Sequence, residues 1–305
     1  MGTYIFSMQK GFWLSVCGIA MVGMASGQMK RQFTVENSQA CESVNLHLKT
    51  NTGDCYIKAG HNSEILNVFS NQDQSSYSHQ YRKEIVNNAC EVYLNFENTN
   101  SKSIGQTIST RMFGDEKPVD NKIWKMYLSD AKAYDLQLEY GVGNAHVDLS
   151  GLAIKKLKIN TGSADVNIGY SSLENKVEMD TLSVKVDLGS LHVQNLNLSR
   201  TRYTSADVGF GNMTLDFSAN PPLVSNHIEG SVGAGNLTII LPPAQIPVLV
   251  TINDSWLCSV KIPKGMKKIR ANTFVNAAYG EDAKNTLVFN LDVSMGNIIF
   301  KEPGK

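Results

Sequence analysis

Apolar and polar residues alternate along most of this chain in short segments, and nearly all of these segments share one local motif. The clearest copy is Gly209-Phe-Gly-Asn-Met-Thr-Leu-Asp-Phe217, in which small and short polar residues precede apolar residues at every second position. Alternation with a period of two is typical of β-strands that bury one face. No segment keeps a helical period of 3.6 residues, so the pattern predicts an all-β protein.

The motif recurs at a nearly constant step, which indicates a repeat. Five central copies occupy residues 141–149, 162–168, 187–193, 209–217 and 233–241, with steps of 21, 25, 22 and 24 residues. A weaker copy lies at 51–57 and a separate one at 294–300, and another alternating strand precedes each central copy. One such unit is too small to bury its own apolar face, but stacked units can do so.

The repeat therefore predicts a parallel β-helix (solenoid) with β-rich N- and C-terminal caps. Its inward side chains would be Ala145, Val147, Leu149, Val166, Ile168, Leu191, Val193, Met213, Leu215, Phe217, Leu237, Ile239 and Leu241. The alternative is an antiparallel β-sandwich, which the strand spacing also fits. A sandwich does not require one motif at a constant step, so we favour the solenoid.

The glycines and short polar residues of the motif are expected to form the corners of the coils. These residues are Gly141, Gly143, Asn144, Gly162, Asp165, Gly189, Gly209, Gly211, Asn212, Gly233, Gly235, Asn236, Gly296 and Asn297. Glycine permits a positive φ and a close approach of main chain to main chain. Short polar side chains can bond back to a turn, and stacked on one another they would form a polar ladder.

The N-terminal residues 1–27 have the pattern of a signal peptide. Lys10 precedes an apolar run at 11–23, and Ala25-Ser-Gly27 supplies a small-residue cleavage site before Gln28. A membrane anchor is the alternative, but the run is shorter than the ~20 residues that span a bilayer. No later stretch could span one, so we expect an exported protein without a transmembrane segment, located in the periplasm, on the outer surface or secreted.

We expect residues 28–305 to form one continuous domain. Residues 28–130 would be an N-terminal β cap and first coils with polar loops, 131–249 the regular repeats, and 250–305 the C-terminal cap. The polar segments 60–84 (a loop or irregular hairpin) and 97–121 depart from the repeat, so function would be sought there and in the C-terminal cap. Trp124, Trp256 and Phe274 are candidates to cover the open ends.

Four cysteines remain after the expected cleavage: Cys41, Cys55, Cys90 and Cys258. Cys55 and Cys90 share the apolar face of their strands, so both should point inward. They would be either small buried residues or the two halves of a Cys55–Cys90 bridge, which an oxidising compartment allows.

The chain resembles the bacterial toast-rack domains, an adhesin-like β-solenoid group, and the C-terminal domain of Lia-type cell-wall-stress proteins. The resemblance depends on the repeated motif, on Leu149-Ser-Gly-Leu152 with Leu157-Lys-Ile-Asn-Thr-Gly162, and on Gly233-Ala-Gly-Asn-Leu-Thr-Ile-Ile-Leu-Pro242. It implies a single-stranded, right-handed β-helix outside the cytoplasm and no particular activity.

No catalytic or metal-binding motif stands out. The formal net charge is +0, which argues against a nucleic-acid partner. His146 and His192 occupy equivalent outward positions but would lie two coils apart, too far to share a metal ion. The corner column is mostly amide, whereas calcium prefers several carboxylates. The basic cluster at 261–270 fits a solvated strand edge or cap.

We therefore expect a non-enzymatic cell-envelope binding or scaffolding protein, with no cofactor, that presents a rigid surface to a protein or glycan. Self-association through an exposed solenoid end is also expected. The alternative is a β-helix carbohydrate-active enzyme, a polysaccharide hydrolase or lyase. Its outward carboxylates Asp148 and Asp216 would lie roughly 14 Å apart, beyond the reach of a catalytic pair.

Overall fold

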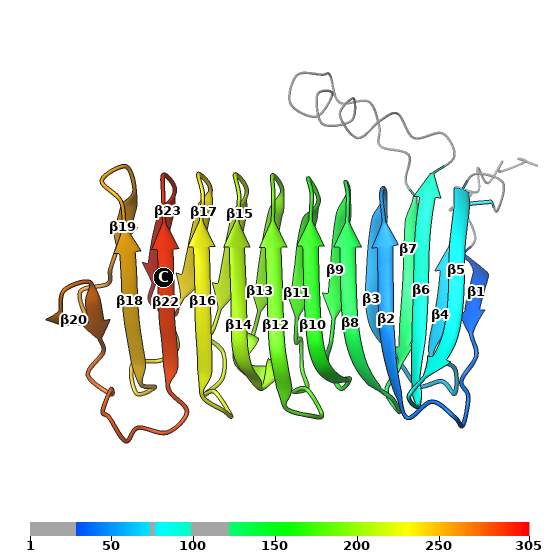
Figure 1. Cartoon of the computed structure of the whole chain (residues 1–305), viewed down its shortest axis with the longest axis horizontal. Helices are drawn as coiled ribbons and strands as arrows, with labels where there is room; N and C mark the ends of the chain where they lie inside the picture. The colour runs from blue at the N-terminus through cyan, green and yellow to red at the C-terminus, as the bar shows by residue number, and fades with distance from the viewer. Residues whose placement is uncertain (1–28, 74–76, 99–121, 305) are drawn as a thin grey trace, which may run out of the picture.

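The computed structural model describes residues 29–73, 77–98 and 122–304, and this part of the chain forms two large β-sheets that face each other along an elongated body (Figure 1). The prediction of an all-β protein is confirmed. Within the described residues the only helix is a single 3-10 turn, η2 (Leu196–Ser199). The expected signal peptide at 1–27 and most of the expected loop at 97–121 lie outside the described residues.

Sheet A contains eleven strands. From edge to edge they are β1 (Lys30–Val35), β4 (Leu66–Ser70), β7 (Ile123–Ser129), β3 (Asp54–Gly60), β9 (Asn144–Asp148), β11 (Asp165–Gly169), β13 (Ser190–Gln194), β15 (Asn212–Asp216), β17 (Asn236–Ile240), β23 (Asn297–Lys301) and β19 (Ser259–Lys261).

Sheet B contains twelve strands. From edge to edge they are β20 (Lys267–Arg270), β21 (Thr273–Val275), β18 (Val248–Asp254), β22 (Leu287–Val293), β16 (Asn226–Val232), β14 (Thr201–Val208), β12 (Met179–Val186), β10 (Ala153–Thr161), β8 (Ala133–Tyr140), β2 (Ser43–Thr50), β6 (Ala89–Asn98) and β5 (Tyr77–Val86).

In the centre the chain passes alternately from sheet B to sheet A, and each strand pairs in parallel with the corresponding strand of the next repeat. Thus β8, β10, β12, β14 and β16 are successive neighbours in sheet B, as β9, β11, β13, β15 and β17 are in sheet A. The antiparallel pairs are β1–β4, β4–β7, β5–β6, β18–β21 and β20–β21, all near the ends. The alternative of an antiparallel sandwich is therefore wrong.

At both ends the order of strands in space differs from their order in the chain. The weak copy of the motif is β3, which pairs directly with β9, whereas β7 comes later in the chain and lies on the outer side of β3. At the other end β23 pairs with β17, and the earlier strand β19 lies outside it. The end units are therefore interleaved. Antiparallel strands form three of the four sheet edges, and β19, which pairs with β23 in parallel, forms the fourth.

The space between the sheets is filled by the apolar side chains of the alternating pattern. Every residue of the predicted inward set is at most 7% exposed, so that prediction is confirmed. Aromatic rings bring the two sheets into contact near the C-terminal end: Phe289 of sheet B lies 5.5 Å from Phe217 and 6.0 Å from Phe300, measured between ring centroids. Full burial of one such side chain stabilises a fold by about 1.5–3 kcal/mol.

The expectation of a loop or irregular hairpin at 60–84 is wrong. This segment contains β4 and most of β5, which belong to different sheets. Within the described ranges strand β5 pairs only with β6, at an edge of sheet B, and most of its residues are exposed. A strand that is solvated on both faces needs no apolar alternation, so its sequence is as polar as that of a loop.

The structure also decides the cysteine pairing. Cys41 and Cys90 form a disulfide, with Cα atoms 5.4 Å apart, so the alternative of a Cys55–Cys90 bridge is wrong. Both Cys55 and Cys90 point inward as expected, but Cys55 lies on β3 of sheet A and Cys90 on β6 of sheet B. Cys55 is a free buried thiol and Cys258 a free, half-buried one.

The three aromatic residues proposed to cover the ends have different positions. Trp124 is buried between the sheets, where its ring stacks on Phe96 with centroids 4.3 Å apart. Phe274 is partly buried against the core. Trp256 is 91% exposed, so the expectation that it packs over an end is wrong. No helix in the described ranges is long and apolar enough to cross a membrane.

Candidate functional site

The expected corner residues lie where a strand of sheet B leads into the following strand of sheet A. The glycines occupy the turns, and Asn144, Asp165, Asn212, Asn236 and Asn297 each begin a sheet-A strand. In Figure 1 these turns form the upper edge of the central part of the body. None of the hollows described below is lined by a corner residue, so we interpret the turns as structural.

Main-chain stacking explains most of the corner glycines. The N–H of Asn212 donates to the carbonyl oxygen of Gly189 at 3.0 Å, and the N–H of Asn236 donates to that of Gly211 at 3.0 Å. A Cβ atom on Gly189, Gly211 or Gly235 would overlap the carbonyl oxygen of the preceding corner. Among the predicted corner residues only Gly143 combines this overlap with a left-handed backbone, at φ +115°.

The polar residues at the corners bond mainly to one another. The amide of Asn144 donates to Asp54 at 2.8 Å, that of Asn236 to Asn212 at 2.8 Å, and that of Asn297 to Asn236 at 2.6 Å. The bonds form the expected polar ladder in two sections. No group of three or more His, Cys, Asp or Glu residues within the described ranges is arranged to hold a metal ion.

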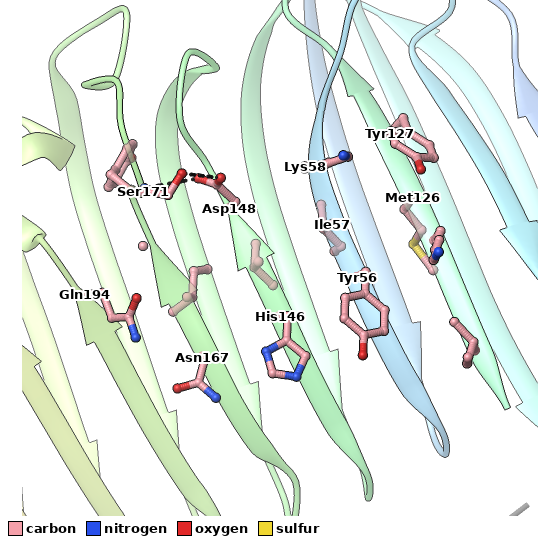
Figure 2. A pocket seen from close by; sticks show the side chains of 16 residues that line it. Tyr56, Ile57, Lys58, Met126, Tyr127, His146, Asp148, Asn167, Ser171 and Gln194 are labelled. Atoms are coloured by element: carbon pink, nitrogen blue, oxygen red, sulfur yellow. Dashed lines mark hydrogen bonds between the residues drawn. The ribbon is translucent and has the colours of Figure 1, made fainter. Parts of the chain in front are cut away.

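A groove of about 720 Å³ lies on the outer face of sheet A, over β7, β3, β9, β11 and β13 (Figure 2). At its centre the rings of Tyr56 and His146 stack, with centroids 5.1 Å apart and planes 19° from parallel. Beside them the Lys58 ammonium lies 5.5 Å from the centroid of the Tyr127 ring. We call this surface the sheet-A groove.

Strand register places the groove side chains in a straight row across the sheet. Tyr56 pairs with Lys125 on one side and with His146 on the other, and Asn167 lies between His146 and His192. Parallel strands are ~4.8 Å apart, so side chains in this row have a regular spacing. A second, shorter row contains Tyr127 and Lys58.

Among the described residues of the groove lining Asp148 is the single carboxylate, and its oxygens already accept hydrogen bonds. The hydroxyls of Ser150 and Ser171 donate to Oδ1 and Oδ2 respectively, each at 2.6 Å (the Ser171 bond is drawn in Figure 2). Partial burial alone would raise the pKa of Asp148, but these hydrogen bonds outweigh it and hold the pKa below its ordinary value. Asp148 is therefore an ionised side chain in the groove, and its oxygens accept these hydrogen bonds.

The two histidines singled out in the sequence have unequal environments. His146 is exposed in the groove, whereas His192 is half-buried on β13, two strands away. Burial lowers the pKa of His192, and the nearby Asp216 opposes that shift in part. The expectation that both are solvent-exposed is thus correct for His146 only. Asn167 separates them, as the repeat predicted.

A second hollow, of about 420 Å³, continues the groove toward β1 and shares Lys125 and Tyr127 with it. Its walls include Phe69 and Arg31, whose guanidinium carbon lies 5.4 Å from the Phe69 ring centroid. Phe69 pairs in register with Lys125. The row of side chains therefore extends from β4 across the sheet to β13.

The outer face of sheet B carries a related but separate arrangement. His47 stacks on Tyr93 at 4.5 Å between centroids, and the Arg82 guanidinium lies 4.3 Å above the same tyrosine ring, in a hollow of about 510 Å³. Farther along that face Tyr203 stacks on His227 at 5.7 Å. The Tyr203 stack resembles that of Tyr56, but Tyr203 lines neither the sheet-A groove nor the hollow around Tyr93. Tyr203 is therefore a natural control for Tyr56.

Acidic and basic residues gather elsewhere. A hollow of about 450 Å³ on sheet B contains Asp207, Glu229 and Asp292, all exposed. Asp207 accepts a hydrogen bond from Ser231 at 2.7 Å. Asp148 and Asp216 lie on β9 and β15, with two strands between them. The basic cluster at 261–270 includes the edge strand β20.

The residues of the groove can be recognised in the sequence as outward positions of strands, but the repeat pattern does not mark them as a site. Tyr56, Lys58 and His146 stand at outward positions of recognised strands. Their neighbours Lys125 and Tyr127 come from β7, and only the interleaved order of the end units brings β7 beside β3. The groove therefore lies on regular strands rather than in the polar segments where function was expected.

Comparisons with known proteins give one family and three distantly similar solved chains, two of which are described below. The sequence profile described as the N-terminal domain of toast_rack, DUF2154, matches residues 24–189, just over half of the chain. No curated protein matches the sequence.

The first structural neighbour is the crystal structure of a candidate cell adhesion protein from Clostridium sporogenes ATCC 15579, with 15% identity, a TM-score of 0.43 and coverage of 90% of this chain and 99% of the other. The second is that of a candidate adhesin from Bacteroides fragilis NCTC 9343, with 10% identity, a TM-score of 0.31 and coverage of 91% and 98%.

Proposed function

Because the chain belongs to the toast-rack family, we propose that it is a non-enzymatic binding protein of the cell envelope and that the sheet-A groove holds its partner, a glycan or a protein. The observation that carries this proposal is the stacked pair of Tyr56 and His146 at the centre of a groove on a sheet face. Binding sites combine apolar, often aromatic, surface with a few placed polar groups, and this groove has both.

The architecture suits a preformed site. The strands beneath the groove are hydrogen-bonded to neighbours on both sides, and their inward side chains are packed between the sheets. A surface held in this way loses little conformational entropy when a partner binds, and such preorganisation increases affinity. Tyr56 remains 38% exposed, so much of its ring is available for contact.

Three further elements belong to the proposal. The two-sheet body is a right-handed, single-stranded parallel β-helix, with the corner glycines and asparagines as its structural turns. The protein is exported, since the Cys41–Cys90 disulfide suits an oxidising compartment and residues 1–27 have the pattern of a signal peptide. Two copies would associate through the strands at the ends of the two sheets, which are β1, β5, β19 and β20.

A carbohydrate-active enzyme is the second candidate, and the hollow with Asp207, Glu229 and Asp292 is the observation that favours it. Glycoside hydrolysis needs two carboxyl groups within about 5–10 Å of each other. One of them acts as a general acid and is usually held in an apolar pocket. Here the three carboxylates are exposed on a sheet face, and the described residues that line the hollow include no aromatic ring to seat a sugar. We therefore rank it below binding.

The test compares Tyr56→Ala with Tyr203→Ala on a glycan array and in binding to isolated cell-envelope polysaccharide. Both substitutions remove an exposed tyrosine that stacks on a histidine, but only Tyr56 lies in the sheet-A groove. We expect wild type and Tyr203→Ala to bind and Tyr56→Ala to lose binding. Equal behaviour of the two variants would refute the groove as the site. If the wild type released reducing ends from the polysaccharide and the double variant Asp207→Asn, Glu229→Gln did not, the enzyme would be favoured.

A further inference from the structure

The charge of the sheet-A groove is one-sided. Its cationic side chains Lys58 and Lys125 form no ion pair with a described residue, and the adjoining hollow adds Arg31. Among the described residues that line the two hollows, Asp148 is the single carboxylate, and Ser150 and Ser171 already bond to it. The formal net charge of the whole chain is +0, so this cationic character is local.

Aromatic rings and cations lie side by side along the groove. In register across the strands, the row contains Phe69 on β4, Lys125 on β7, Tyr56 on β3 and His146 on β9. Asn167 on β11 follows. Two of the three cations also lie near an aromatic face: Arg31 is 5.4 Å from Phe69, and Lys58 is 5.5 Å from Tyr127. A ligand here meets apolar ring faces and positive charge in turn.

The geometry points to a linear anionic polysaccharide, such as a polyuronate, laid across the strands of sheet A; we propose this as the ligand class of the groove. The inference rests on the proposed function and specifies its partner. A pyranose ring offers apolar C–H faces that fit Tyr56 and Tyr127, and carboxylates along the chain fit Lys58 and Lys125. Side chains within a row are spaced at ~4.8 Å, close to the advance of one sugar unit in an extended chain.

Other polyanions fit the surface less well. Nucleic-acid binding depends on an extended basic surface, whereas this groove supplies three cations and the protein has no net charge. An acidic peptide would satisfy the cations. It has no regular series of saturated rings to match the aromatic row, and extended peptides usually join a sheet at its edge. The groove lies over strands that are already paired on both sides.

The experiment measures binding of the full chain to three probes of matched length: a galacturonic acid hexamer, neutral cellohexaose and a glutamate hexamer. We expect the uronate to bind most tightly, with an affinity that falls as NaCl rises from about 50 to 300 mM. Lys58→Gln and Lys125→Gln should each weaken uronate binding about two- to fivefold, as expected for an exposed ion pair, and have little effect on cellohexaose. Lys58→Arg should retain affinity.

Lys158→Gln is the matched control, because Lys158 is an exposed lysine on the outer face of sheet B. Tighter binding of cellohexaose than of the uronate would overturn the anionic class but leave the proposed function standing. Equal binding of the glutamate hexamer would show that charge alone is recognised and would overturn the glycan. No loss of uronate binding in Tyr56→Ala would refute the groove itself, and with it the proposed function.

Discussion

The backbone of Gly211 lies directly against that of Gly189 in the neighbouring corner, with no space between them for a side-chain carbon. The N–H of the residue after Gly211, Asn212, donates to the Gly189 carbonyl oxygen at 3.0 Å. This hydrogen bond joins the two corners, and the close approach of the two main chains leaves no room for a side chain. This contact leads to the first prediction.

Gly211→Ala should destabilise the protein by about 1–3 kcal/mol, because the added methyl group must displace main chain rather than a flexible side chain. Besides the carbonyl, it would meet Cγ2 of Val186 at 2.9 Å. The free energy of unfolding in urea measures the effect. Gly265→Ala is the control, since no atom lies within 4 Å of a Cβ there, and it should change stability by less than about 0.5 kcal/mol. Equal effects would contradict main-chain stacking as the reason for the glycine.

Reduction of the Cys41–Cys90 disulfide should lower stability by about 2–4 kcal/mol, because the bond closes a long loop of the unfolded chain. Urea unfolding with and without dithiothreitol checks this. Cys258→Ser, which removes a free thiol, should keep the full response to the reductant. The double variant Cys41→Ser, Cys90→Ser should lose it. A response that disappears in Cys258→Ser instead would mean that the pairing is wrong.

Asn175→Ala should be among the more damaging substitutions, at about 2–4 kcal/mol, because it leaves buried main-chain groups without partners. The Asn175 side chain is fully buried; it accepts from the N–H of Ile154 at 2.8 Å and donates to the carbonyls of Ile154 and Ser199 at 2.7 and 3.2 Å. Thermal and urea unfolding give the measurement. Asn253→Ala, at an exposed asparagine, should be nearly neutral, and a comparable loss there would argue against this account.

His192 should make stability depend on pH below neutrality. Burial lowers its pKa in the folded protein relative to the ordinary 6.5, so below about pH 6.5 the unfolded chain binds more protons than the folded one. Stability should therefore fall as the pH decreases from 6.5 through the folded-state pKa and then stop responding to this group. His192→Gln should flatten that part of the profile. His146→Gln, at an exposed ring, should leave it in place; the reverse result would contradict the burial of His192.

Sequence alternation was sufficient for much of this fold because each central strand has one buried and one solvated face. Residues such as Val147 and Leu215 are buried as the period of two requires. The same reasoning failed for β5, because this strand is exposed on both faces and its sequence is as polar as that of a loop. Alternation could not identify the Cys41–Cys90 disulfide either. The periodicity of a strand shows which of its residues point inward, but not which strand lies next to it.

The sequence by itself determined most of the strands, their inward faces and the family. Those features depend on short-range chemistry: side-chain period, backbone freedom and small polar turns. Only the tertiary structure decided which strands are neighbours at the ends, since any two units with the same inward pattern can stack at the same spacing. That choice places β7 beside β3 and so brings Tyr127 and Lys125 next to Tyr56 and Lys58. The candidate site exists because of this neighbour relation, which no local pattern in the chain encodes.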